Sequence, residues 1–315
     1  WVHILKYLHE AGKTSLHEEA SFLKAVAITF FRLNKRQASD IYGHLRFKVL
    51  KLGEINTGTY ESKQIMKTIE SFVEFMEQSA KWYRNLYSLN SNSGLASEMN
   101  ERLGRLRAQD NHANILPLFL ALTIRKEKEC AEDLPGLLHL LEVFNFRTYI
   151  VPHGYYSTWL QGPLYELAHG YYYWMLEDAT DSSQVRLARD SHLIESLIDY
   201  SMYSGKVTDE QIDQRLFDKP KTEAFDFGGW RGIKYFLICY EAFQRQSKTT
   251  QIDSILQSRS AGKTGDYLSL EHIWATKHIV DERSREERLY QKRRLGNFML
   301  LEMDTNIRGS NQPIE

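Results

Sequence analysis

The chain of 315 residues contains little cysteine, little proline and no excess of basic charge. Cys130 and Cys239 are its 2 cysteines, and they lack the Cys-x-x-Cys spacing of a thiolate zinc site. With only 6 Pro and 18 Gly, the composition favours long helices over short strands and turns. The sequence has no apolar run near the roughly 20 residues that a membrane span needs. Isolated thiols and the lack of such a run predict a cytoplasmic protein without a membrane segment.

The charges of the chain are almost balanced, with 40 Lys and Arg against 41 Asp and Glu. The chain therefore lacks a global positive field, and any contact with DNA requires a local basic patch. The sequence begins at Trp1 inside an amphipathic pattern and ends at Glu315 as a new element starts. We expect both ends to lie within a longer protein.

Helical periodicity runs through the first 246 residues. Ser15 and Glu18 have the spacing of a capping box, which predicts a helix from Leu16. Over residues 61–87, apolar side chains recur every three or four positions and so share one face of a long helix. Further helices are predicted at 96–109, 115–129, 134–149, 163–177, 182–203, 209–217 and 230–246. We expect residues 1–246 to form a multi-helical domain.

The composition changes after this domain. Residues 247–265 are polar and rich in Ser, Thr and Lys, which is typical of a linker. Two short apolar runs, at 266–273 and 295–301, predict strands, and a helix could begin at Pro313. The expected fold class is therefore mainly α, with a small ββα-metal module over 266–315 that is incomplete at its C-terminal end.

The two predicted strands carry side chains suited to phosphodiester hydrolysis. This reaction needs a base for the attacking water, a cation for the developing charge and a group that orients the base. His272 suits the base because imidazole titrates near neutral pH, and Asn297 could orient it. Glu271 and Asn306 could bind Mg²⁺ through oxygen. Successive strand residues point to opposite faces, so Glu271 and His272 can share a site only where the strand ends.

A family resemblance rests on the same residues. The runs LSLEHI and LGNFMLLEMDTNIRGSNQPIE resemble the HNH module of bacterial anti-phage nucleases of the GmrSD and SspE type. Residues 144–151 and 230–241 resemble, more loosely, the helical region that precedes that module. The chain departs from the family pattern at Trp274, where a Pro commonly stands. The family's N-terminal ParB-like nucleotidase domain is not among these 315 residues.

The resemblance implies a restriction endonuclease that nicks or cleaves double-stranded DNA in defence against phage, acting on or triggered by modified DNA. It implies that His272 is the general base, Asn297 the orienting residue, and Glu271 and Asn306 the metal ligands; Asn311 is an additional candidate. The implied cofactor is Mg²⁺, or Mn²⁺ or another divalent cation. The implied partners are DNA and the nucleotidase domain of the longer protein.

A basic stretch lies between the two predicted strands. Such runs are usually solvated helix faces, but here the stretch could contact the DNA backbone beside the hydrolytic site. Phosphate contacts would make binding salt-dependent without selecting a sequence. The candidate residues are Arg283, Arg288, Lys292, Arg293 and Arg294.

Two other interpretations remain open. The chain could be a non-catalytic DNA-binding or oligomerisation part of a larger restriction protein, which includes assembly as a homo-oligomer. It could also be an RNase, because the same residues can attack an RNA phosphodiester. His272 is one of 11 histidines, and Asn297 and Asn306 could be ordinary turn residues.

Overall fold

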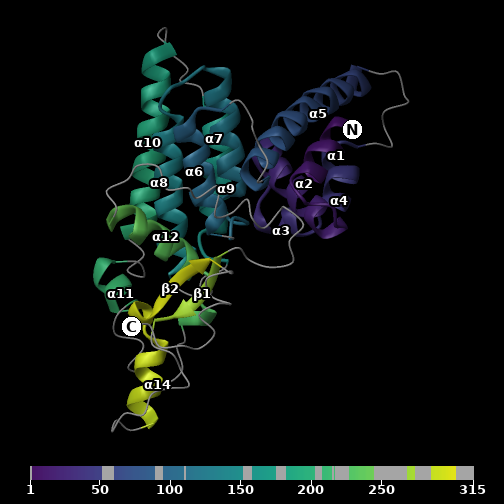
Figure 1. The fold of residues 1–315 in the computed structure, drawn as a ribbon. Coiled ribbons are helices and arrows are strands. Elements are labelled where there is room, and N and C mark those ends of the chain that lie inside the picture. Colours follow the sequence, from purple (N-terminus) through teal and green to yellow (C-terminus); the bar gives the residue numbers. More distant parts are fainter. Residues whose placement is uncertain are drawn as a thin grey trace. The chain divides into compact units, whose positions relative to one another are not determined.

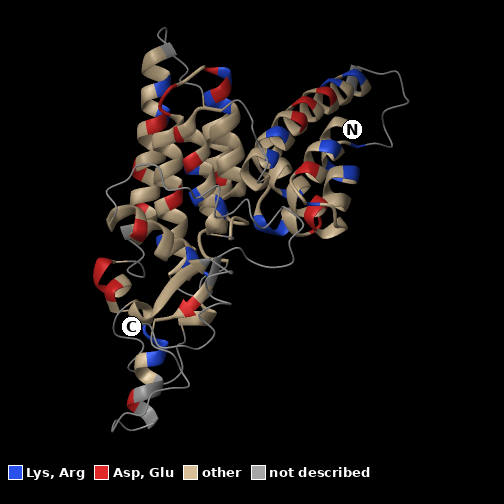
Figure 2. Ribbon diagram, viewed as in Figure 1, with Lys and Arg blue, Asp and Glu red and all other residues tan. Residues whose placement is uncertain are grey.

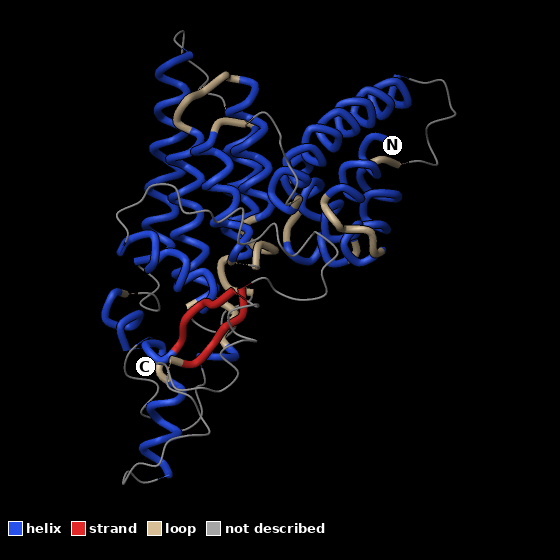
Figure 3. The backbone as a smooth tube through the Cα atoms, in the orientation of Figure 1, coloured by secondary structure: helices blue, strands red, loops and turns tan. Residues whose placement is uncertain are grey.

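A computed structural model describes the fold over eleven stretches of the chain, which are residues 2–51, 60–88, 95–109, 111–151, 158–174, 182–202, 208–214, 216, 227–244, 268–273 and 285–302. This described part is mainly helical, as predicted, and includes a two-stranded sheet (Figures 1 and 3). The chain divides into two compact units. The first comprises Trp1–Gly94, Asn111–Leu141 and Ser157–Tyr200, and the second comprises Leu95–Asp110, Glu142–Tyr156 and Ser201–Glu315.

The first unit is built from helices whose start signals are visible in the sequence. The predicted capping box is confirmed, because the Ser15 N–H donates to Glu18 Oε2 over 3.2 Å and the Glu18 N–H donates to Ser15 Oγ over 3.3 Å. The helices are α1 (Val2–Glu10), α2 (Leu16–Phe31), α3 (Lys35–Ser39), α4 (Ile41–His44) with a π turn at Leu45–Val49, α5 (Tyr60–Tyr87), α7 (Leu116–Lys128), α9 (Gln161–Tyr172) and most of α8 (Leu134–Asn145) and α10 (Ser182–Met202).

Helix α7 forms the centre of this unit. Every residue from Leu116 to Ile124 is buried, as expected for a helix that is apolar on all sides. The helix packs against α2, α5 and α9. The buried hydroxyl of Thr29 donates to the Pro117 carbonyl over 3.0 Å, which satisfies one of the few polar groups between α2 and α7. The unit is thus a layer of helices around one apolar helix.

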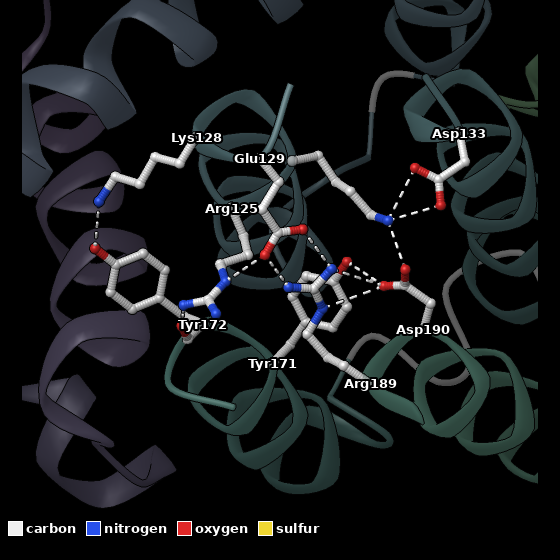
Figure 4. A network of polar contacts seen from close by, with 9 residues as sticks. Arg125, Lys128, Glu129, Asp133, Tyr171, Tyr172, Arg189 and Asp190 are labelled. Atoms are coloured by element: carbon white, nitrogen blue, oxygen red, sulfur yellow. Dashed lines mark hydrogen bonds and ion pairs between the residues drawn. The ribbon is translucent and has the colours of Figure 1, made fainter. Parts of the chain in front are cut away.

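A network of three cations and three carboxylates lies where α7 ends (Figure 4). Arg189 is fully buried and contacts both oxygens of Glu129, at 2.5 and 2.8 Å. Burial disfavours both charges, yet this bidentate contact raises the pKa of Arg189 and lowers the pKa of Glu129. The Lys126 ammonium lies 2.5 Å from Asp190 and 2.6 Å from Asp133. The remaining members are Arg125, which donates to Glu129, and Tyr171, which donates to Asp190.

The second unit contains the two-stranded sheet and the helices that support it. Its elements are α6 (Ser97–Ala108), the end of α8 with a π turn at Phe146–Ile150, α11 (Asp209–Asp213), a 3-10 turn at Phe227–Gly229, α12 (Ile233–Gln244), β1 (Leu268–His272), α14 (Arg285–Arg293), a 3-10 turn at Leu295–Asn297 and β2 (Phe298–Glu302). The helix predicted over 134–149 therefore changes at residue 146 to wider π geometry. The helix predicted over 209–217 is α-helical to Asp213 and has π geometry at Gln214 and Leu216.

The core of the second unit gathers around Trp230. Its ring N–H donates to the Ile150 carbonyl over 2.8 Å, so the indole is buried without an unpaired donor. A Cβ at position 232 would overlap the Trp230 ring and the Ile150 side chain, which explains the glycine there. Leu295 and Phe298 belong to the same buried cluster. The sheet is thus anchored on residues that precede the predicted domain boundary at 246, while the predicted linker, 247–265, lies outside the described residues.

A polar cluster is buried in the same unit. The Tyr235 hydroxyl donates to Glu142 over 2.7 Å, and the side-chain amide of Gln109 donates to the Glu142 carbonyl over 2.9 Å. Burial, reinforced by the negative charge of Glu142, raises the pKa of the Cys239 thiol to about 11.

None of the described helices has the length and apolar character that a membrane crossing requires.

The buried network of the first unit predicts a specific loss of stability. Replacing Lys126 with Met removes one of the two cations that contact the buried Asp190, because Arg189 remains 3.1 Å away, and we expect a destabilisation of up to about 3–5 kcal/mol. Replacing Lys128, an exposed neighbour on the same helix, with Met should cost less than about 1 kcal/mol. Urea denaturation of both variants measures the difference. Similar losses in the two variants would contradict a buried role for Lys126.

The raised pKa of Cys239 predicts selective alkylation. Cys130 is exposed, whereas Cys239 stays protonated at neutral pH, and the thiolate is the form that reacts. Iodoacetamide at pH 7.5 should therefore modify one cysteine of the folded protein and both cysteines in denaturant. The fold protects Cys239 until the pH approaches its pKa of about 11. Peptide mass spectrometry identifies the modified residue, and equal labelling rates in the folded protein would refute the assignment.

Candidate functional site

The hairpin of β1 and β2 holds the predicted catalytic residues. The strands pair antiparallel over five residues, with His272 opposite Phe298 and Glu271 opposite Met299. Both predicted strands are present, but the second begins later than expected. Residues 295–297 form a 3-10 turn, and the Asn297 N–H donates to the Arg294 carbonyl over 3.0 Å instead of to β1. The placement of Asn297 on the second strand was therefore wrong, and this residue directly precedes β2.

Asn297 nevertheless lies where it can orient the histidine. Its carbonyl accepts from the Ile273 N–H over 2.9 Å, which places the turn against the end of β1. Its side chain is buried, with 8% exposed. The amide nitrogen lies 3.2 Å from the Lys292 carbonyl and 3.4 Å from His272 Nδ1. One buried amide thus connects the end of α14 with the imidazole.

These contacts favour one tautomer of His272. A carbonyl can only accept, so the contact with Lys292 assigns the nitrogen, rather than the oxygen, of the Asn297 amide to this position. An amide nitrogen can only donate, so Nδ1 of His272 must be the acceptor. In the neutral ring the proton then resides on Nε2. The Phe298 ring, with its centroid 4.5 Å from that of the imidazole, packs beside His272 and limits its rotation.

Glu271 occupies the neighbouring ladder position, and the regular register continues through His272. Because side chains alternate along a strand, Glu271 and His272 leave the sheet on opposite faces. The twist that would bring them to one face is not seen within the paired residues.

Among the described residues, no three His, Cys, Asp or Glu side chains come close enough to hold a metal ion. Glu271 offers the hard oxygen that Mg²⁺ prefers, but it makes only part of a site, and the predicted ligands Asn306 and Asn311 lie outside the described residues.

The basic residues cluster beside this hairpin. Lys292 and Arg293 lie in the last turn of α14, where positive charge also complements the helix dipole (Figure 2). Arg294 follows, is exposed and places its guanidinium 5.4 Å from the centre of the Tyr290 ring. Arg288 lies on α14, and Arg283 lies outside the described residues. The described part of the stretch therefore gathers positive charge next to Asn297.

Two contacts within the site were not predicted from the sequence. Phe298 packs on His272, and the Lys292 carbonyl accepts from Asn297. The strand pattern could have identified Phe298, because the residue after Asn297 begins the second strand and faces the end of the first. The Lys292 contact depends on where α14 ends, and a charged run does not specify that point.

No family model, no curated protein and no solved structure matches the chain. The resemblance to HNH anti-phage nucleases therefore rests on the sequence motifs alone.

The tautomer of His272 can be measured directly. In the wild-type protein, ¹⁵N NMR at a pH where the ring is neutral should show the Nε2–H form. Asn297→Asp replaces the amide donor with a carboxylate, which only accepts, so we expect a shift to the Nδ1–H form. The exposed His17 on α2 serves as the internal reference and should not change. An unchanged tautomer in Asn297→Asp would show that the 3.4 Å contact does not orient the ring.

Proposed function

We propose that the chain is the nuclease part of a metal-dependent DNA endonuclease that acts in bacterial defence against phage. The observation that supports this proposal is the contact between His272 and Asn297, two residues that are 25 positions apart in the sequence. A base and its orienting amide are two of the three groups that phosphodiester hydrolysis requires, the third being the cation. The resemblance adds the expectation that the substrate is modified DNA, or that a DNA modification triggers cleavage.

In this proposal His272 acts through Nδ1. The contact with Asn297 is long, at 3.4 Å, so an attacking water can replace the amide at that nitrogen. Nδ1 takes a proton from the water, the water oxygen forms a bond to phosphorus, and the bond to the leaving oxygen breaks. The leaving oxygen then takes up a proton from solvent. Asn297 sets the tautomer of the ring before the water binds, and the packing of Phe298 then keeps the ring in place, which reduces the entropy lost on reaching the transition state.

Glu271 and Asn306 would hold the metal ion. Mg²⁺ commonly keeps several waters and needs only one or two protein ligands, which is compatible with the single carboxylate on the hairpin. When bound, the ion supplies positive charge that stabilises the pentacovalent phosphorus and the leaving oxygen. Because Glu271 leaves the sheet on the face opposite His272, the scissile phosphate would have to lie at the end of β1 to be within reach of both side chains.

The proposed partner is double-stranded DNA, bound through its phosphates. Lys292, Arg293 and Arg294 surround the end of α14 and are the described candidates for these contacts. The chain as a whole carries a net charge of −1, so this patch has to supply the attraction locally. The nucleotidase domain that the resemblance implies, and a second copy of the chain, are further proposed partners.

Plasmid cleavage tests the proposed activity. Wild-type protein with Mg²⁺ or Mn²⁺ should nick or linearise supercoiled DNA, and His272→Ala should lower the rate by about 10²–10⁴-fold because it removes the base. His17→Ala, in the first unit, is the matched histidine control and should cleave at the wild-type rate.

Other outcomes distinguish the alternatives. If wild type and His272→Ala are equally inactive while both retain DNA, the chain is a DNA-binding module and not a nuclease. If matched RNA competes better than DNA and is cleaved instead, the chain is an RNase.

Two further variants separate the roles within the site. Glu271→Ala should weaken Mg²⁺ or Mn²⁺ binding measured by calorimetry, because it removes a carboxylate ligand. Asn297→Ala should leave metal affinity unchanged and lower the cleavage rate at saturating metal, because it only frees the imidazole. Equal metal affinity in both variants would overturn this division of roles.

A further inference from the structure

A cavity of about 1110 Å³ lies beside the hairpin, within the second unit. One side is formed by α12, and the other by the 3-10 turn and β2. Its volume is slightly above the roughly 300–1,000 Å³ that is usual for ligand sites. The cavity is large enough for a small planar molecule together with the charged group attached to it.

The apolar lining of the cavity includes an aromatic pair on α12. Phe236 and Tyr240 are one helical turn apart, and their rings are almost parallel, with an angle of 5° and centroids 6.4 Å apart. Phe236 packs against the core of the unit, whereas 53% of Tyr240 is exposed. An exposed ring supported by a partly buried one provides a flat surface on which another planar ring can stack.

Polar side chains border this aromatic surface. Glu241 and Gln244 lie on α12, and Gln291 and Arg294 lie across the cavity at the end of α14. A carboxylate and two amides can pair with the amino and carbonyl groups at the edge of a nucleobase. The guanidinium of Arg294 can bind the phosphate of the same nucleotide. An aromatic surface with amide, carboxylate and guanidinium groups at its edge matches a nucleotide better than a purely apolar ligand.

The cavity adjoins the proposed hydrolytic centre. Asn297 lines it and also holds His272, and Ile273 lines it directly after His272 in the chain. A nucleotide bound there would therefore place its phosphate near His272, the proposed base for the attacking water.

We propose that this cavity binds one unstacked nucleobase of the DNA substrate, with its ring on Tyr240 and its phosphate at Arg294. The base has to leave the stack of the duplex, because neighbouring bases cover its faces there and leave none for the ring of Tyr240. The inference rests on the proposed function for the identity of the ligand as DNA. It adds base recognition to a site that would otherwise contact only the backbone.

Binding without cleavage tests this proposal. A short single-stranded oligodeoxynucleotide carrying a fluorescent purine analogue is titrated with the full chain in EDTA, so that metal-dependent cleavage does not occur. Wild-type protein should quench the fluorescence, because stacking on tyrosine changes the environment of the analogue. Tyr240→Ala should weaken binding about 5- to 150-fold, which corresponds to the about 1–3 kcal/mol of one base–aromatic stack. Tyr240→Phe should bind like the wild type, because the ring remains.

Phe243→Ala is the matched control, because Phe243 lies on the same helix, is 78% exposed and does not line the cavity. Its binding and quenching should equal those of the wild type. Circular dichroism of each variant verifies folding, and both replaced side chains are largely exposed. The proposal would be overturned if Tyr240→Ala quenched the fluorescence as strongly as the wild type. It would also be overturned if Tyr240→Ala and Phe243→Ala lost binding affinity equally.

The proposal that the cavity binds a base can fail or succeed independently of the proposal that the chain is a nuclease. Quenching that depends on Tyr240 in a protein that never cleaves plasmid would support the base site and refute the nuclease. Cleavage that depends on His272 but not on Tyr240, without quenching, would support the nuclease and refute the base site.

Discussion

The antiparallel register of β1 and β2 is the constraint on which the candidate site depends. It sets His272 opposite Phe298, and a slip of one residue would move His272 to the other face of the sheet. Phe298 prevents that slip, because it belongs to the buried cluster around Trp230 and is only 5% exposed. The bond from Ile273 to Asn297 closes the ladder at the same end. The position of the imidazole is therefore determined by the core of the second unit.

That core also explains why a short hairpin can support a site. A two-stranded sheet is only marginally stable by itself in water, so its side chains have to pack against other elements. Leu270, Leu295 and Phe298 pack against residues of the helical segments, including Ile150 and Trp230. The helical part of the second unit therefore acts as the scaffold of the hairpin. In the sequence, these segments had been grouped with the N-terminal helices, because helical periodicity does not show which core a helix joins.

The sequence predicts local features better than it predicts distant contacts. The capping box at Ser15 and the long helix α5 could be predicted because their signals lie within a few residues of each other. The proximity of His272 and Asn297 followed from two predicted strands together with the resemblance. The exact position of Asn297 did not, because a 3-10 turn depends on the backbone bond to Arg294. The buried ion network joins residues up to 64 positions apart, and charge patterning along the chain cannot pair them.

The network around Arg189 also affects how the first unit responds to heat. Hydration of charged groups carries a strongly negative entropy, so their hydration free energy becomes less favourable as the temperature rises. Keeping the largely buried Lys126, Arg189, Glu129 and Asp190 away from water therefore becomes less costly as the temperature rises. Hydrophobic stabilisation per unit area does not grow in the same way. The ion network at the end of α7 is thus the part of this unit whose relative contribution to stability increases toward the melting temperature.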